Sequence, residues 1–151
     1  MDFTLLKDKI SQIVDESAEE VLELTKELVR IPSRNPPGEY ERISKFIADK
    51  LKDIGFDVTV VRSKPTKPNV IARLKGVTGK PTLMYSSHMD TVPEGSGWTV
   101  DPFGATTKEG KIFGRGSLDA KSRIAVYIMA AKTLLDAGLT LKGDLLEVVS
   151  R

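Results

Sequence analysis

Residues 82–90, TLMYSSHMD, decide the fold of this chain, because a short apolar segment here ends in a histidine and an aspartate. The segment 82–87 follows a proline and has the pattern of a buried β-strand. In α/β proteins, ligand sites lie just past the carboxyl ends of such strands. His88 and Asp90 occupy that position, so the same stretch predicts both a strand and a candidate site.

The rest of the chain alternates between helical and extended patterns. Apolar residues recur at helical spacing in three segments, which predicts amphipathic helices. These helices span 10–30, 43–54 and 120–137. Short apolar runs predict further strands. These strands span 57–61, 69–74, 111–113 and 145–149. The alternation predicts an α/β layered protein in which residues 1–151 form one domain or part of one.

The composition is that of a globular protein. The chain has 151 residues, of which 40% are hydrophobic and 29% charged, and this length is enough to bury a core. Its 23 basic and 21 acidic residues are interspersed, which predicts neither a nucleic-acid partner nor a membrane surface. No cysteine is present, so disulfides and thiolate zinc ligands are excluded. Because no apolar run approaches the roughly twenty residues of a membrane helix, we expect a cytoplasmic protein.

Three side chains in two short motifs form the candidate site. His88 and Asp90 follow the strand 82–87, and Asp119 lies in GRGSLDAK, residues 114–121, at a predicted strand-to-helix turn. In a His-x-Asp pair, one imidazole nitrogen can bind a metal while the carboxylate takes the proton of the other nitrogen. Asp119 offers two further carboxylate oxygens, which suits the bridging of two cations. Imidazole together with carboxylate favours zinc, with cobalt and manganese as alternatives.

Each of these residues also has a purely structural interpretation. A single histidine after a strand is more often a hydrogen-bonded structural residue than a metal ligand. Asp119 taken alone is well explained as the N-cap of a helix that begins at Ala120. Arg115 is typical of a surface or salt-bridging residue. Two aromatic residues in the irregular segment 89–109 are predicted to anchor that loop rather than to contact a substrate: Trp98 and Phe103.

Nucleotide binding is disfavoured by the second motif. The spacing of Gly114 and Gly116 before a helix is shared with dinucleotide-binding loops, but Asp119 occupies the third glycine position. A carboxylate there would repel a pyrophosphate. A phosphate-binding P-loop is rejected as well, because Ala120 and Arg115 stand where that loop requires glycine.

The motifs, in their order along the chain, resemble a family of two-zinc amidohydrolases and metallopeptidases. This family includes aminoacylase, acetylornithine deacetylase, succinyl-diaminopimelate desuccinylase and glutamate carboxypeptidase. The matching segments are IPS (31–33), NPPGE (35–39), SHMDTVP (87–93), Trp98, DPF (101–103) and GRGSLDAK (114–121). Ser122 departs from the pattern, because the family usually has glycine there. The resemblance implies a fold of the zinc-peptidase type, a three-layer α/β/α sandwich with a mainly parallel sheet.

The resemblance also implies a reaction and a role for each candidate residue. His88 is expected to bind one zinc, Asp119 to bridge two zinc ions, and Asp90 to serve catalysis by orienting His88. The implied reaction is hydrolysis of an amide bond in an N-acyl amino acid or a short peptide. Substrates in the family include acetylornithine, succinyl-diaminopimelate, acyl amino acids and dipeptides, and the motifs here do not choose among them. A homodimer is expected for the full-length form.

We expect this chain to be the amino-terminal part of such an enzyme, without its lid and dimerisation domain. In the family, a Glu-Glu pair that carries the general base follows the strand corresponding to 145–149, and further ligands come later. Here the chain ends at Arg151, and Glu147 lies inside that strand rather than at its end. The isolated chain is therefore expected to bind zinc weakly and to hydrolyse nothing. The alternative is a non-catalytic remnant that acts as a binding or assembly module.

Overall fold

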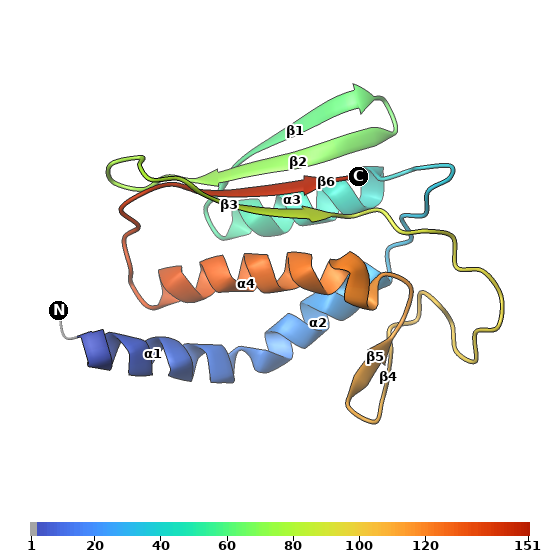
Figure 1. Cartoon of the computed structure of the whole chain (residues 1–151), viewed down its shortest axis with the longest axis horizontal. Helices are drawn as coiled ribbons and strands as arrows, with labels where there is room; N and C mark the ends of the chain where they lie inside the picture. The colour runs from blue at the N-terminus through green and yellow to red at the C-terminus, as the bar shows by residue number, and fades with distance from the viewer. Residues whose placement is uncertain (1–2) are drawn as a thin grey trace.

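The computed structural model describes residues 3–151, which form one sheet, a small hairpin and four helices (Figure 1). The helices are α1 (Phe3–Glu16), α2 (Ala18–Val29), α3 (Glu41–Asp53) and α4 (Ser122–Asp136). The strands are β1 (Asp57–Lys64), β2 (Lys67–Leu74), β3 (Leu83–His88), β4 (Thr106–Lys108), β5 (Lys111–Phe113) and β6 (Leu145–Ser150). All strands predicted from the sequence are present, and β4 is an addition within the segment expected to be irregular.

The main sheet has the strand order β1-β2-β6-β3 and mixed strand directions. The pairs β1–β2 and β2–β6 are antiparallel, and only β3 and β6 run parallel. The expectation of a mainly parallel sheet is therefore wrong for this part of the chain. The physical reason is the connection between β1 and β2, which is only residues 65–66, and a link that short can join only antiparallel strands.

The helices cover one face of this sheet (Figure 1). α3 lies against β1 and β2, α4 against β3, and α1 and α2 pack behind α4. The residues 3–151 thus provide two layers of the expected three, one of strands and one of helices. The sheet residues buried under the helices include Val70, Ala72, Ser87, Leu145, Glu147 and Val149. This alternation of buried and exposed residues is what one covered face imposes on a strand.

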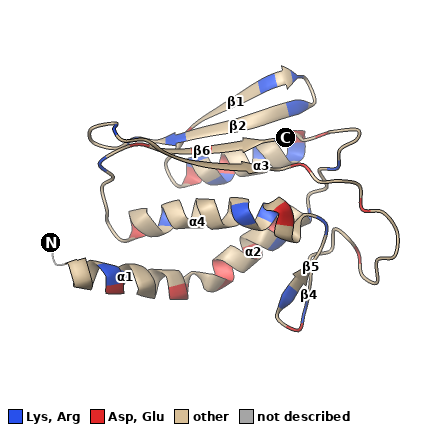
Figure 2. Cartoon of the chain, in the orientation of Figure 1, with Lys and Arg blue, Asp and Glu red and all other residues tan. Residues whose placement is uncertain are grey.

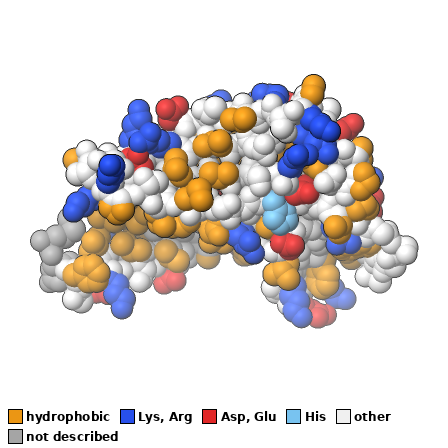
Figure 3. All heavy atoms as spheres, turned by 45° about the horizontal axis from the view of Figure 1, so that its top comes forward, with side chains coloured by type: hydrophobic (Ala, Val, Ile, Leu, Met, Phe, Trp, Pro, Cys, Tyr) orange, Lys and Arg blue, Asp and Glu red, His pale blue; other side chains and the backbone are white. Residues whose placement is uncertain are grey.

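The opposite face of the sheet is largely uncovered and carries a central group of apolar side chains. Ile71 pairs with Val148, and Met84 pairs with Leu146, so these side chains form adjacent rows on that face. Met84, on the edge strand β3, is 58% exposed. Figure 3 shows hydrophobic side chains gathered over this side of the molecule. β3, which pairs in parallel with β6, is the edge strand on this side of the sheet.

The helical core follows from regular apolar spacing. α3 buries Ile43, Ile47 and Leu51, which recur every four residues on one stripe. α4 in the same way buries Ile124 and Ile128 against the sheet. These side chains join those of β2 and β6 in a single apolar cluster. The cluster lies directly beneath the strands whose carboxyl ends carry the candidate site.

The first predicted helix, 10–30, is two helices in the structure. The break is at Ser17, whose ψ of 2° is not helical. Its hydroxyl donates a hydrogen bond to the carbonyl of Val14, and such local side-chain bonds compete with helix continuation. α1, on the far side of the break, has no buried residue.

Charges of both signs are interspersed over the helices, whereas β3 carries no Lys, Arg, Asp or Glu (Figure 2). No element carries a long run of one sign, which agrees with the interspersed pattern of the sequence. Among residues 3–151, no helix combines the length and the apolar character needed to cross a bilayer.

Glu147 is an acidic residue inside the core. It lies in the middle of β6 between Ala72 and Tyr85, and it is 1% exposed. Neither carboxylate oxygen has a hydrogen-bond partner. Burial without a partner disfavours the charged form and raises the pKa of this carboxyl to about 8. Glu147 is therefore protonated in the folded chain at neutral pH.

The pH dependence of stability should report this buried carboxyl. Between pH 5 and 8 the folded chain holds a proton on Glu147 that the unfolded chain has released, because the ordinary pKa is 4.5. The free energy of unfolding should therefore fall as pH rises, by up to about 1.4 kcal/mol per pH unit. Urea titrations at pH 5 and pH 8 measure this change. Glu147→Gln should remove it, and an equal pH dependence in wild type and variant would contradict the assignment.

Candidate functional site

The parallel pairing of β3 with β6 positions the first half of the site. His88 is the last residue of β3 and pairs with Ser150, the last residue of β6. The chain then leaves the sheet, with the Met89 N–H still bonded to the Ser150 carbonyl at 2.8 Å. His88 and Asp90 therefore line a cavity of about 290 Å³ at the carboxyl edge of the sheet, as the sequence predicts.

The imidazole of His88 is held between two aspartates. Its Nδ1 lies 3.1 Å from the backbone carbonyl of Asp90 and 3.3 Å from the carboxylate of the same residue. Both of these groups are acceptors, which favours the tautomer with the proton on Nδ1. Nε2 lies 3.1 Å from Oδ1 of Asp119. The three predicted residues are thus brought together.

Asp119 lies on a wide turn, not at a helix N-cap. Its φ of −129° and ψ of 98° are extended values, and Ala120 is non-helical as well. The peptide bond between these two residues is cis. α4 begins only at Ser122, and Asp119 makes no capping hydrogen bond, so the N-cap interpretation is excluded. With 76% of its side chain exposed, Asp119 projects a carboxylate into the cavity rather than stabilising a helix.

Residues 33–35, which follow α2, hold the end of β3 and the residues after it in place by hydrogen bonds. The Thr91 N–H donates to the Ser33 carbonyl at 2.9 Å, and the Asn35 N–H donates to the Thr91 carbonyl at 2.8 Å. The Ser33 hydroxyl donates to the Met89 carbonyl at 2.6 Å. Asn35 also places its amide 3.5 Å from the second oxygen of Asp90. Sequence reasoning recognised IPS and NPPGE only as motifs and missed this role.

Lys121 connects this segment to the turn of Asp119. Its side chain is fully buried, and its ammonium donates to the Ile31 carbonyl at 2.7 Å. Burial lowers the pKa of the Lys121 ammonium to about 8. The sequence contained this residue in the motif GRGSLDAK but gave no chemical reason to single it out.

The loop that follows the site is anchored by two cation–ring contacts. The Arg115 guanidinium lies 5.4 Å from the ring of Trp98, and that of Arg34 lies 5.4 Å from the ring of Phe103. Both arginines and Trp98 also contact Glu94: Arg115 and Trp98 donate to its carbonyl, and Arg34 pairs with its carboxylate. Trp98 and Phe103 act as anchors, as the sequence suggests, and Arg115 also lines the site cavity.

The donor set fits part of a zinc site. Two ligands held tetrahedrally about 2.0–2.1 Å from one zinc ion lie about 3.3 Å apart, close to the 3.1 Å between Nε2 of His88 and Oδ1 of Asp119. Within residues 3–151, however, no three His, Cys, Asp or Glu side chains are grouped to hold a metal ion. The described residues therefore offer two ligands and one orienting carboxylate, fewer donors than a closed zinc site needs.

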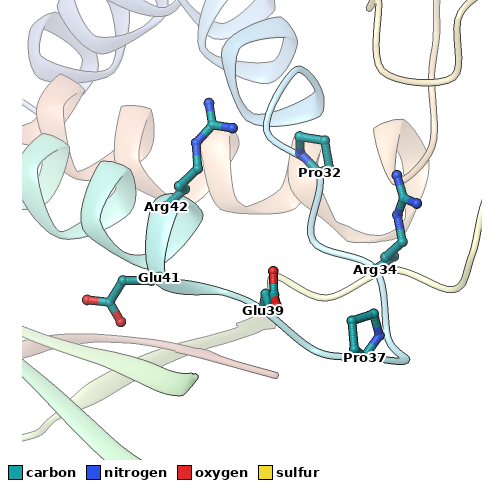
Figure 4. A pocket seen from close by; sticks show the side chains of 6 residues that line it. All are labelled: Pro32, Arg34, Pro37, Glu39, Glu41 and Arg42. Carbon is teal, nitrogen blue, oxygen red and sulfur yellow. The ribbon is translucent and has the colours of Figure 1, made fainter. Parts of the chain in front are cut away.

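A second cavity, of about 390 Å³, lies where the segment 32–39 meets the start of α3 (Figure 4). Its lining residues are Pro32, Arg34, Pro37, Glu39, Glu41 and Arg42. Figure 4 shows the two arginines on either side of Pro32. Arg34 is committed to its ion pair with Glu94, and Glu41 pairs with Arg62 at 2.7 Å. With charges of both signs and no imidazole, this cavity is a poorer metal site than the smaller one.

Comparison with known proteins agrees with this geometry. Residues 84–149 match the model of the peptidase family M20/M25/M40, a segment that includes both site motifs. The chain is 34% identical over 138 residues to the N-formyl-4-amino-5-aminomethyl-2-methylpyrimidine deformylase of Bacillus subtilis, covering 88% of this chain and 32% of that protein. It is 39% identical over 127 residues to the succinyl-diaminopimelate desuccinylase of Gluconacetobacter diazotrophicus, covering 82% and 32%. The similarity to this peptidase family thus includes the part of the chain that holds both site motifs.

Solved structures support the same assignment. Human carnosine dipeptidase 1 superposes with a TM-score of 0.84 at 27% identity, over 97% of this chain and 34% of that one. The M20 family metallo-carboxypeptidase Sso-CP2 from Sulfolobus solfataricus gives 0.77 at 26% identity, over 87% and 30%. The α/β fold of the zinc-peptidase type is thereby confirmed. The chain spans about a third of the length of the relatives it matches.

Gly116 tests how tightly the turn of Asp119 is fitted. Its φ is +85°, and a Cβ added there would lie 2.7 Å from Cγ2 of Thr91. Gly116→Ala should therefore lower the free energy of unfolding by about 2 kcal/mol or more, from backbone strain plus the contact. Gly110→Ala is the matched control, because Gly110 has a φ of +71° and no atom near its added Cβ. Equal losses in urea denaturation of the two variants would show that the contact has no effect.

Proposed function

We propose that this chain is the amino-terminal part of the catalytic domain of a metal-dependent amidohydrolase. The supporting observation is the convergence of His88, Asp90 and Asp119, from two distant motifs, in one cavity. The nitrogen–oxygen distance of 3.1 Å between His88 and Asp119 suits two ligands of one ion. The substrate class is an N-acyl amino acid or a short peptide, because the named relatives include a desuccinylase, a deformylase and a dipeptidase.

Each of the three residues has a distinct role in this proposal. His88 would hold one zinc ion through Nε2, and the exposed carboxylate of Asp119 would be shared between two zinc ions. Asp90 accepts the Nδ1 proton of His88, which fixes the tautomer and makes the ring a stronger ligand. Zinc, when bound, polarises the scissile carbonyl and lowers the pKa of a water molecule. Cobalt and manganese are alternative ions for the same donors.

In this proposal, none of His88, Asp90 and Asp119 is the general base. Glu147 is unsuitable, because it is buried under the sheet and does not line the cavity of His88. A base has to reach the attacking water, directly or through one bridging molecule. The chain by itself is therefore proposed to bind metal without hydrolysing an amide. The competing proposal is a remnant that binds a partner, and it is favoured only by the small number of donors.

Zinc titration of the 151-residue chain tests the ligand assignment. We expect weak binding, with a Kd above about 1 μM, because two donors leave the zinc coordination incomplete. His88→Ala should abolish binding, and Asp90→Asn should weaken it by about 10–100-fold. Isothermal calorimetry at pH 7 provides the measurement, with Glu109→Gln as a control at an exposed turn. Zinc affinity that survives in His88→Ala would overturn the assignment.

Activity assays test the incomplete catalytic set. The isolated chain loaded with zinc should release no amine from N-acetyl amino acids or dipeptides above the buffer rate. Ninhydrin or chromatographic detection of the amine provides the readout. Turnover by the wild-type chain that disappears in His88→Ala would show that the residues present are sufficient for catalysis, against this proposal.

A further inference from the structure

Lys121 is a buried cation that none of the proposed roles uses. It lies two residues after Asp119, at the point where the turn becomes α4, and its side chain is fully buried. The long aliphatic part packs against Gly116, where an added Cβ would lie 3.2 Å from Cδ of Lys121. The ammonium reaches the carbonyl of Ile31, a residue ninety positions earlier in the chain. Lys121 thus joins two segments that the site requires.

The contacts continue from Ile31 to His88. Two residues after Ile31, Ser33 bonds through its hydroxyl to the Met89 carbonyl and through its own carbonyl to the Thr91 N–H. Met89 directly follows His88 in the chain. The Thr91 methyl group also lies next to Gly116, so the strand end contacts the turn directly as well. A continuous path of contacts therefore runs from Asp119 through Lys121 and segment 31–33 to His88.

A lysine is an expensive residue at this position. Burial of an ammonium in the core costs free energy unless several hydrogen bonds replace its water, and here one bond to a carbonyl is made. Methionine would fill nearly the same volume without burying a charge. For core packing alone, methionine would therefore serve as well or better. What methionine cannot provide is the bond to the Ile31 carbonyl.

We propose that Lys121 is the positioning residue that keeps His88 and Asp119 at ligand distance, by tying the turn of Asp119 to segment 31–33. Lys121 does not touch the metal or the substrate and acts through the backbone of the two site segments. The inference rests on the proposed function only because it treats Nε2 of His88 and Oδ1 of Asp119 as metal ligands. The positioning itself is a statement about the folded chain.

Amide hydrogen exchange distinguishes positioning from general support of the core. The Thr91 and Asn35 amides form the hydrogen bonds between residues 33–35 and Thr91, just past the end of β3. In Lys121→Met, both amides should exchange at least about tenfold faster. The Val70 and Val149 amides in the sheet should keep their protection, and the urea midpoint should not fall. Lys132→Met is the matched control, because Lys132 lies on α4, the helix that follows Lys121, and forms only partly exposed surface pairs. It should leave all four amides unchanged.

Zinc affinity supplies the second readout. Lys121→Met should weaken zinc binding at least about tenfold at unchanged stability, since the two ligands are no longer held together. The chain has no cysteine, so Lys121→Cys can be alkylated in denaturant with bromoethylamine and refolded, which restores an ammonium at this position. The alkylated protein should recover both the zinc affinity and the protection of Thr91.

Three results would overturn the inference. The first is that Lys121→Met loses amide protection throughout the sheet and has a lower urea midpoint, because this result indicates a core-packing role. The second is unchanged exchange and zinc affinity in that variant. The third is that the alkylated Lys121→Cys protein recovers neither zinc affinity nor protection of the Thr91 amide. This comparison tests the inference even if Lys121→Met does not fold. Absence of zinc binding in the wild type would instead refute the proposed function, while the exchange data would still test the positioning.

Discussion

Six residues of β3 pair in parallel with β6, and the rest of the site depends on this ladder. Parallel strands require a crossover, and here α4 provides it by running back along the sheet. A helix that returns in this way begins at the carboxyl end of the first strand. The residues just before Ser122 therefore lie beside His88, which is how Asp119 comes within 3.1 Å of a ring that precedes it by thirty-one residues.

The same arrangement explains why two motifs that are separate in the sequence form one cavity. Neither motif is inside a regular element, because each occupies the end of one: His88 closes β3, and Asp119 precedes α4. Residues at such ends have free backbone groups that the sheet and helix do not satisfy. The segment 31–35 supplies partners for several of these groups, so the site is stabilised by a part of the chain that contains none of the candidate ligands.

Lys121 and Glu147 are both buried in this fold, and their surroundings differ. Lys121 has a carbonyl partner and connects two segments, whereas Glu147 has no partner and lies between the sheet and the helices. Burial shifts both pKa values toward neutrality, lowering that of Lys121 and raising that of Glu147. The hydrogen bond of the buried Lys121 ammonium links the turn of Asp119 to the segment that contains Ile31.

The sequence by itself determined the elements and the chemistry of the site. Apolar periodicity located the helices and strands, and the His-x-Asp pair with Asp119 predicted the candidate donors, because these patterns depend on residues close together in the chain. Only the tertiary structure decided the antiparallel β1–β2–β6 pairing, the break at Ser17, the exclusion of the N-cap role for Asp119, and the bond from Lys121 to Ile31. A hydrogen bond across ninety residues leaves no local pattern, since its two partners meet only after the crossover has closed.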